Sequence, residues 1–396
     1  RGALMLSISI KHPDAEKFID AKMKEGKITG ANVSVRIDDE FMKAIKNGKK
    51  YIQQYPINSE NPIYKNEIDA RALWEKIVHN AWKSAEPGIL FWDTIIRESV
   101  PDCYSEKGYK TVSTNPCGEI PLCPYDSCRL LAVNLYSYVN EPFTKNANFN
   151  KELFREHTNY AQRMMDDIID LELEKIDGIL EKIKDDPEDE EIKRVEYKLW
   201  EKIQQKAKEG RRTGIGITGE GDMLAALGLR YGSEEGNIFS EELHKEMALE
   251  VYRASVETAK ERGAFEIYDF EKEKNNPFIQ RLFGEDKQLE EDMKKYGRRN
   301  IALLTVAPTG TTSLMTQTSS GLEPVFQMAY TRRRKVNPND KDVKIAFTDE
   351  VGDSWEEYNV FHYKFEKWLE INGHNIDDVK KYDKEKLDEI AKKSPY

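Results

Sequence analysis

The segment STNPCGEIPL, residues 113–122, holds three side chains whose types and spacing allow chemistry on a small substrate. Its two prolines lack a backbone donor and its glycine disfavours a helix, so we expect an extended loop. In an extended chain residues two apart point the same way, which would place Asn115, Cys117 and Glu119 on one face. A thiol can exchange hydrogen or electrons, a carboxylate can take a proton, and an amide can hold a substrate oxygen. An ordinary turn with a buried cysteine fits the same spacing, and both interpretations stay open.

The cysteines of the chain are confined to the stretch from Cys103 to Cys128. Zinc is the obvious ligand for such a group, but Cys103, Cys117, Cys123 and Cys128 contain no C-x-x-C pair of the zinc-finger type. The histidines form no metal-binding spacing; they are His12, His79, His157, His244, His362 and His374. We therefore expect no metal site, and keep a zinc-binding or structural module as the non-enzymatic alternative.

A second polar group, Ala307–Ser313 (APTGTTS), follows an apolar stretch typical of a buried strand. Small and hydroxyl-bearing residues between a strand and a helix offer N–H groups, hydroxyls and the positive end of a helix dipole to a phosphate. An N-cap with a glycine turn would have the same sequence, and the G-x-x-x-x-G-K pattern of a P-loop is missing. The loop-rich region continues through Thr318–Phe326.

Strands and helices alternate along the chain that must position these groups. Strands are predicted over Leu4–Ile10, Asn32–Ile37, Gly214–Gly219 and Ile301–Val306. Helices are predicted over Asp14–Lys24, Asp222–Leu227 and 153–208, the last as two helices joined by an acidic turn at 185–191. This alternation favours an α/β fold in which strand ends carry the site.

Composition limits the classes of protein that fit. The 396 residues are 39% hydrophobic, enough for a folded core. With 61 basic and 72 acidic residues the net charge is −11, which disfavours a nucleic acid polymer as partner. No apolar run approaches the roughly 20 residues of a membrane helix, and nothing resembles a secretory signal. We therefore expect a cytoplasmic protein with reduced thiols. Because the chain begins abruptly at Arg1, we also expect a fragment or a processed product.

Taken together, the motifs resemble those of a known family. STNPCGEIPL, YDSCRLLAVNL and APTGTTSLMTQTSSGLEPVF are similar, in the same order, to motifs of the catalytic chain of ribonucleotide reductases, most closely the class II enzymes that depend on adenosylcobalamin. RGALMLSISIKHPD, ITGANVSV and RRTGIGITG extend the resemblance over residues 1 to about 335. It implies a ten-stranded α/β barrel with a central finger loop, incomplete in this chain. Residues 1–396 would be a single catalytic barrel domain, with 333–396 as its charged C-terminal segment.

The resemblance also implies roles for individual residues in the reduction of ribonucleotides to 2'-deoxyribonucleotides. Cys117 would form the thiyl radical that takes the 3'-hydrogen, Glu119 would accept the 3'-hydroxyl proton, and Asn115 would hydrogen-bond the sugar. Cys128 would be one member of a redox-active cysteine pair. Substrate-binding residues would be Asn115, Pro116, Cys117, Gly118, Glu119, Pro308, Thr309, Gly310, Thr311 and Thr312. The specificity loop, which relays effector identity, would be Lys27, Ile28, Thr29, Gly30 and Ala31.

The implied cofactor is adenosylcobalamin, and the implied reductant is a dithiol protein such as thioredoxin. Implied partners are a ribonucleoside di- or triphosphate, nucleotide effectors, and complementary reductase fragments or flanking chain, with no membrane. In the family the second redox cysteine lies upstream of RGALM and a further cysteine pair lies near the C-terminus, so we expect the middle portion of a reductase that needs other polypeptides for turnover. Cys123 is a poorer replacement for the missing partner, since it lies on the same segment as Cys117. A class I enzyme with a diiron partner, or a glycyl-radical relative, is the enzymatic alternative.

Overall fold

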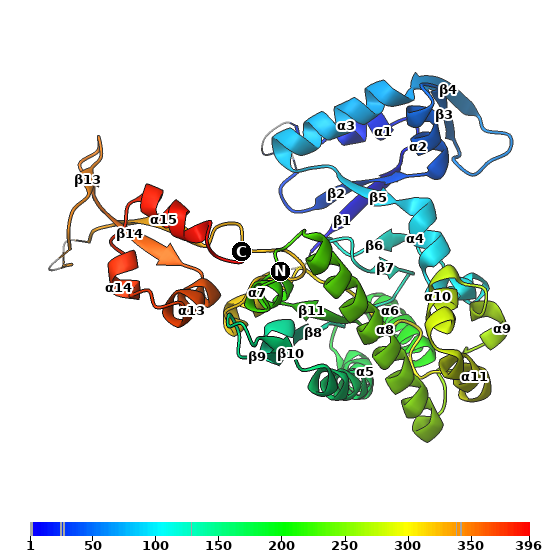
Figure 1. The fold of residues 1–396 in the computed structure, drawn as a ribbon. Coiled ribbons are helices and arrows are strands. Elements are labelled where there is room, and N and C mark those ends of the chain that lie inside the picture. The colour runs from blue at the N-terminus through cyan, green and yellow to red at the C-terminus, as the bar shows by residue number, and fades with distance from the viewer. Residues whose placement is uncertain (1–2, 24–25, 27, 128, 338, 341–342) are drawn as a thin grey trace. The chain divides into compact units, whose positions relative to one another are not determined.

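The computed structural model describes residues 3–23, 26, 28–127, 129–337, 339–340 and 343–396 of the protein. The chain forms two compact units, which can be followed by residue colour in Figure 1. Unit 1 comprises Arg1–Arg129, Arg163–Gly214 and Tyr252–Thr305, and unit 2 comprises Leu130–Gln162, Ile215–Val251 and Val306–Tyr396. Two long helices, α5 (Lys151–Asp185) and α8 (Glu234–Arg262), contribute residues to both units.

Unit 1 is built on a parallel sheet of order β1-β2-β5, with strands at Met5–Ser9, Asn32–Ile37 and Gly88–Phe91. The first two strands confirm the predictions for this region, the second residue for residue. Val35 and Ile37 of β2 pack in a core with helices α1 (Ala15–Ile19), α2 (Asp39–Lys46) and α3 (Ala70–Ser84). Because side chains alternate along a strand, Asn32, Ser34 and Arg36 lie on the opposite face. That second face of β2 is the one that meets the site.

The other strands of unit 1 form two antiparallel pairs, β3 (Lys50–Tyr55) with β4 (Tyr64–Asp69), and β6 (Ser113–Thr114) with β7 (Pro121–Leu122). Its remaining helices are α4 (Trp92–Glu98), η1 (Pro101–Lys107), α6 (Glu190–Gly210), α9 (Phe270–Glu273), α10 (Pro277–Glu285) and α11 (Lys287–Tyr296). Helices α5 and α6 confirm the predicted pair with an acidic turn between them. The side chain of Asp189 accepts from Glu191 N and caps α6.

Two of the predicted elements differ in the structure. The helix expected over Asp14–Lys24 is limited to Ala15–Ile19, because the next amides bond three residues back, Ala21 N to Phe18 O and Met23 N to Asp20 O. The strand expected over Ile301–Val306 is wrong. The carbonyls of residues 300 and 301 accept from the guanidinium of Arg298 instead of a neighbouring strand. Ile301 N donates to Gly210 O at 2.8 Å and Ala302 O accepts from Thr213 N at 2.9 Å, but apart from an isolated bridge at Leu304 no strand forms here.

Unit 2 contains the parallel pair β8 (Leu131–Asn134) and β11 (Ile215–Thr218), the latter confirming the prediction over Gly214–Gly219. Helix α7 (Glu220–Ala226) follows β11 and confirms the helix predicted there. The other elements are η2 (Leu135–Tyr138), β9 (Val139–Asn140), β10 (Asn148–Phe149), α12 (Gly310–Thr316), β12 (Ala329–Lys335), β13 (Phe347–Thr348), β14 (Ser354–Phe361), α13 (Tyr363–Ile371), α14 (Ile376–Val379) and α15 (Lys384–Ala391). Strands β12, β13 and β14 form an antiparallel sheet with β14 in the centre, against which α13–α15 build a small core.

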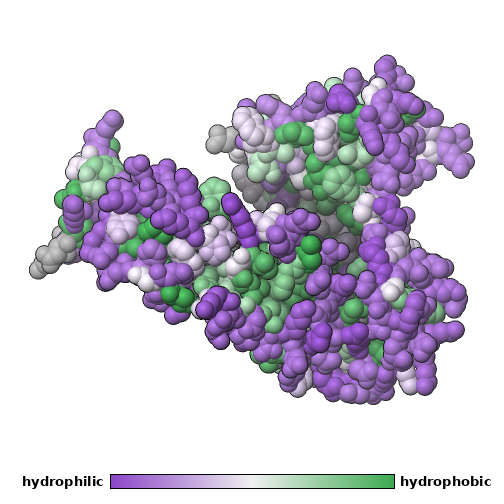
Figure 2. Space-filling view, in the orientation of Figure 1, coloured by the Kyte–Doolittle hydropathy of each residue, from purple (hydrophilic) through white to green (hydrophobic). Residues whose placement is uncertain are grey.

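The fold is mixed α/β, as the sequence predicts. Within the described ranges the strands fall into separate small sheets, two of them parallel, and none closes into a barrel. Figure 2 shows a surface on which hydrophilic residues predominate, in keeping with a chain that is 34% charged. Among the described helices, none combines the length and apolar character that crossing a bilayer requires.

Candidate active site

The thiol-bearing segment forms the tip of a short hairpin in unit 1. Strands β6 and β7 pair with Thr114 opposite Pro121. Between them Gly118 N donates to the Asn115 carbonyl at 3.0 Å, and Gly118 has a φ of 85°. The expected extended loop is wrong here: residues 115–118 form a turn, because the missing side chain of Gly118 permits the positive φ that closes it.

Cys117 lies at this turn with its side chain exposed. Partial burial of the sulfur and the nearby charge of Glu119 raise the pKa of the Cys117 thiol above its ordinary value. At neutral pH the group is therefore a protonated thiol, the form that can donate a hydrogen atom. A cavity of about 350 Å³ adjoins it, lined by Pro116, Cys117 and Gly118 together with residues of β1, β2 and β5.

Glu119 and Asn115, on either side of Cys117 in the sequence, differ in their hydrogen bonding. Glu119 Oε2 is buried and has no hydrogen-bond partner among the described residues. An acceptor left in this state is costly unless a donor arrives, and a substrate hydroxyl would be such a donor. Asn115 Oδ1 accepts from Ile120 N at 3.0 Å, so its amide oxygen stabilises the loop. The amide nitrogen of Asn115, with its two donors, is the part that can reach a ligand.

Residues far away in the sequence hold the hairpin in place. Asn32 Nδ2, at the start of β2, donates to the carbonyl of Pro116 at 3.1 Å. Thr305 Oγ1 donates to the carbonyl of Glu119 at 3.4 Å, and Arg36 Nη1 donates to the carbonyl of Val112 at 3.4 Å. Sequence reasoning missed these contacts. Only the alternation of β2, which places Asn32 and Arg36 on one face, hinted at them.

The other cysteines have different surroundings. Cys123 is buried, and burial together with the charge of Asp126 raises the pKa of its thiol to about 12. Cys103 is half-buried and also has a raised pKa, mainly through burial. Both thiols are therefore protonated at neutral pH, and both are less exposed than Cys117. Cys128, the expected redox cysteine, lies outside the described residues.

The expected phosphate-binding residues lie in unit 2, at the start of α12. Gly310, Thr311 and Thr312 are exposed, and a cavity of about 740 Å³ is lined in part by Pro308, Gly310 and Ser313. Thr309 has a left-handed backbone, with a φ of 51°. Its hydroxyl accepts from Gly321 N at 2.7 Å, which fixes the loop against the following turn.

The expected specificity loop precedes β2. Lys27 lies outside the described residues. Thr29 and Gly30 are exposed, and Ala31 is buried where the chain enters the sheet. The next residue is Asn32, so this loop runs directly into the side chain that holds the hairpin.

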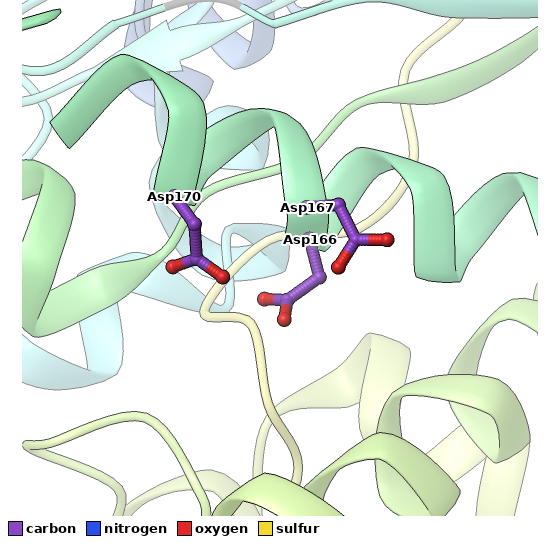
Figure 3. A group of neighbouring side chains, drawn as sticks. All are labelled: Asp166, Asp167 and Asp170. Carbon is purple, nitrogen blue, oxygen red and sulfur yellow. The ribbon is translucent and has the colours of Figure 1, made fainter. Parts of the chain in front are cut away.

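One group of carboxylates has the spacing of a metal site. Asp166, Asp167 and Asp170 project from neighbouring turns of α5 (Figure 3). Asp166 is completely buried, and it bonds Arg211 at 2.8 Å and Arg262 at 3.1 Å. Asp167 and Asp170 also bond these two arginines. Because guanidinium groups already neutralise the carboxylates, the cluster is structural.

Comparison with known proteins covers nearly the whole chain. Residues 1–389 match the family model described as ribonucleotide reductase, barrel domain. The vitamin B12-dependent ribonucleoside-diphosphate reductase of Thermoplasma acidophilum is 33% identical over 334 residues, covering 84% of this chain and 36% of the relative. The protein of the same name from Mycobacterium tuberculosis strain CDC 1551 / Oshkosh is 30% identical over 336 residues, covering 84% of this chain and 40% of the relative. The chain thus spans less than half the length of these relatives.

A solved structure supports the fold. The class Id ribonucleotide reductase alpha subunit of Actinobacillus ureae superposes with a TM-score of 0.54 at 21% sequence identity. The superposition covers 82% of this chain and 49% of the other.

Proposed function

Because the chain belongs to the ribonucleotide reductase barrel-domain family, we propose that it is the catalytic portion of a class II enzyme that reduces ribonucleotides to 2'-deoxyribonucleotides. The observation that carries the proposal is the exposed Cys117 thiol at a hairpin tip, near a buried carboxylate oxygen of Glu119 that has no hydrogen-bond partner among the described residues. The vitamin B12 dependence in the names of the relatives supports the class.

In the proposed reaction Cys117 acts as the hydrogen-atom carrier. Its sulfur, as a thiyl radical, takes the 3'-hydrogen of the ribose and becomes a thiol, leaving the unpaired electron on the sugar. The raised pKa of Cys117 supports this role, since a protonated thiol can return the hydrogen atom. Its exposed position beside a cavity of about 350 Å³ allows a sugar to approach the sulfur.

Glu119 and Asn115 are the proposed partners of this step. Glu119 Oε2, an acceptor with no donor among the residues described, would accept the 3'-hydroxyl proton. Asn115 would donate from its amide nitrogen to a sugar oxygen, while its amide oxygen keeps the turn closed. Pro116 and Gly118 would shape the same loop.

The phosphate and effector functions are proposed for two separate loops. Pro308–Thr312 would hold the substrate phosphates, supported by its exposed small and hydroxyl residues and the cavity of about 740 Å³ beside it. The loop Lys27–Ala31 would relay the identity of a bound effector nucleotide. Its direct continuation into Asn32, which bonds the hairpin, supports that role.

Cofactor, reductant and compartment complete the proposal. Adenosylcobalamin would supply the unpaired electron when bound, and the exposed thiol of Cys117 is accessible to such a group. Cys128 would belong to the redox-active pair, re-reduced by a thioredoxin-like dithiol protein. Complementary reductase polypeptide or flanking chain would supply the rest of the enzyme, since the relatives are much longer. We place the protein in the cytoplasm, where thiols stay reduced. Residues 1–396 would form one catalytic barrel domain, with 333–396 as its C-terminal segment.

The test is product formation by the completed enzyme. Supplied with adenosylcobalamin, a dithiol and a ribonucleoside di- or triphosphate, it should form the 2'-deoxyribonucleotide. Activity that instead needs an iron-containing partner and ignores cobalamin would identify a class I enzyme. Stoichiometric tightly bound zinc without nucleotide affinity would overturn the enzymatic proposal.

A further inference from the structure

A buried carboxylate in unit 2 joins α7 to the turn that follows α12. Asp222 is completely buried, and its Oδ2 accepts from Ser319 N at 2.7 Å. Asp222 N donates in return to Ser319 Oγ at 3.2 Å. Two opposed hydrogen bonds therefore fix the backbone at residue 319 against the start of the helix.

The same carboxylate receives two side chains from the C-terminal segment. His362 Nε2 lies 2.8 and 2.9 Å from the two oxygens of Asp222. Tyr396 donates its hydroxyl to Oδ1 at 2.8 Å. We call Asp222, His362 and Tyr396 the Asp222 cluster. Its members come from three separate parts of the sequence, so their meeting reflects the fold and no local motif.

From residue 319 the contacts continue to Thr309. The hydroxyl of Thr218 lies 2.9 Å from that of Thr309 and 3.3 Å from the carbonyl of Ser319. Gly321 N donates to Thr309 Oγ1 at 2.7 Å. Thr309 has the left-handed backbone, which for a β-branched residue persists only where its surroundings hold it. The hydrogen bonds from Asp222 thus end on the residue whose conformation shapes the Pro308–Thr312 loop.

The backbones of α7 and the segment after the turn are also in close contact. A Cβ placed on Gly221 would lie 2.7 Å from Pro324 Cα and 3.0 Å from the carbonyl oxygen of Glu323. Only glycine allows this approach, and it brings the neighbouring Asp222 within reach of Ser319. The start of α7 is therefore a fixed support for residues 319–324.

We propose that Asp222 is a positioning residue for the Pro308–Thr312 loop, and that His362 and Tyr396 hold its carboxylate in place. The inference rests on the proposed function of that loop in binding substrate phosphates. An amide in place of the carboxylate has one acceptor oxygen instead of two, so it cannot accept from both Ser319 N and the Tyr396 hydroxyl, and the turn that restrains Thr309 is released. The loop then loses the one geometry that matches the phosphates, while the chemical groups on the hairpin are unaltered.

The test compares a phosphorylated ligand with its unphosphorylated form. In Asp222→Asn the affinity of the full chain for CDP should fall at least tenfold, about 1.4 kcal/mol, while the affinity for cytidine changes less than about twofold. In the completed enzyme KM for the ribonucleotide should rise by a similar factor with kcat kept within about threefold. If the role of Asp222 were purely structural, Asp222→Asn would weaken the binding of CDP and cytidine alike, or lower kcat as well as raise KM.

A matched control lies two residues away. Glu220 is in the same helix, and its side chain bonds a histidine, His244, at 2.9 Å. Its contact with the turn comes from the backbone N–H, which donates to Gly321 O at 3.4 Å and is kept in Glu220→Gln. Glu220→Gln should leave the CDP to cytidine ratio unchanged. If Asp222→Asn does not fold, Tyr396→Phe, which removes one donor, should give the same selective loss in smaller measure.

Two results would separate the possible failures. If the wild-type chain and the completed enzyme bind no nucleotide, the proposed function itself is wrong. If the wild type binds CDP and the Asp222 and Tyr396 variants bind it with unchanged affinity, the proposed function stands and the positioning role is refuted.

Discussion

The chemical state of Cys117 depends on its neighbours. Partial burial and the carboxylate of Glu119 raise the pKa of the thiol, while the turn keeps the sulfur exposed. Cys123, six residues further on, is buried and has a pKa raised to about 12. Among the cysteines that the structure describes, Cys117 is the exposed one, and its thiol is protonated at neutral pH, as the proposed hydrogen-atom carrier requires.

The effect of the Glu119 charge on the Cys117 thiol predicts how the reactivity of this thiol depends on pH. Glu119→Gln removes a negative charge, so the pKa of Cys117 should fall. The rise in the rate of Cys117 alkylation by iodoacetamide with increasing pH should then begin at a lower pH than in the wild type. The same variant cannot accept a proton, and we expect kcat to fall about 10²- to 10⁴-fold. Mass spectrometry of the alkylated peptide measures the first effect. Cys123 is the internal control, and an unchanged Cys117 profile would show that Glu119 does not act on the thiol.

At the scale of elements, β2 and the hairpin of β6 and β7 work as a pair. The face of β2 opposite the core supplies Asn32, which bonds the carbonyl of Pro116 in the hairpin turn, and Arg36, which bonds the carbonyl of Val112 just before β6. Since a strand in a parallel sheet is a rigid support, the hairpin takes its position from the sheet.

This pairing predicts that Asn32→Ala affects activity more than stability. Loss of one partly exposed hydrogen bond should cost about 1 kcal/mol or less of the free energy of unfolding. The hairpin would shift, and a misplacement of about 1 Å can lower kcat by about 100-fold. Urea unfolding and deoxyribonucleotide formation measure the two effects. A variant with full activity would show that other contacts position the loop.

The carboxylates of Asp166, Asp167 and Asp170 anchor helix α5 through their bonds to arginines. Burial acts to raise the pKa of Asp166, but its hydrogen bonds to Arg211 and the charge of Arg299 lower it, and the net direction is down. The ionised carboxylate therefore stabilises the fold at neutral pH, and this contribution is lost as the pH falls through the depressed pKa of the folded state.

Removing the carboxylate of Asp166 should strongly destabilise the fold. Asp166→Ala removes the fully buried carboxylate that Arg211, Arg262 and Arg299 share and leaves the buried guanidinium of Arg211 with only the partly exposed Asp170, so we expect about 3–5 kcal/mol less free energy of unfolding. Asp167→Ala, at the exposed neighbour, should cost no more than about 1 kcal/mol. Equal effects of the two substitutions in denaturant titrations would contradict the assignment of Asp166 as the structural centre.

Across the whole molecule, the sequence predicts those helices and strands whose formation depends on the local hydrophobic pattern. Asn32–Ile37 is a strand to the residue, because strict alternation leaves one register for a half-buried strand. The turn at 115–118 and the missing strand at 301–306 could not be predicted from local pattern. Their conformations depend on partners, a carbonyl three residues away and the buried guanidinium of Arg298, that hydrophobic pattern does not show. The bond from Asn32 to Pro116 spans 84 residues and has no local signal at all.

Cys117, as the hydrogen-atom carrier, is the central residue of the proposed function. The most direct measurement is deoxyribonucleotide formation by the completed enzyme with Cys117→Ser, alongside Cys103→Ser as a control with a half-buried thiol. A serine hydroxyl cannot form the sulfur radical, so Cys117→Ser should give no product above background while Cys103→Ser retains most of the wild-type rate. Product formation by Cys117→Ser at a wild-type rate would contradict the proposed mechanism.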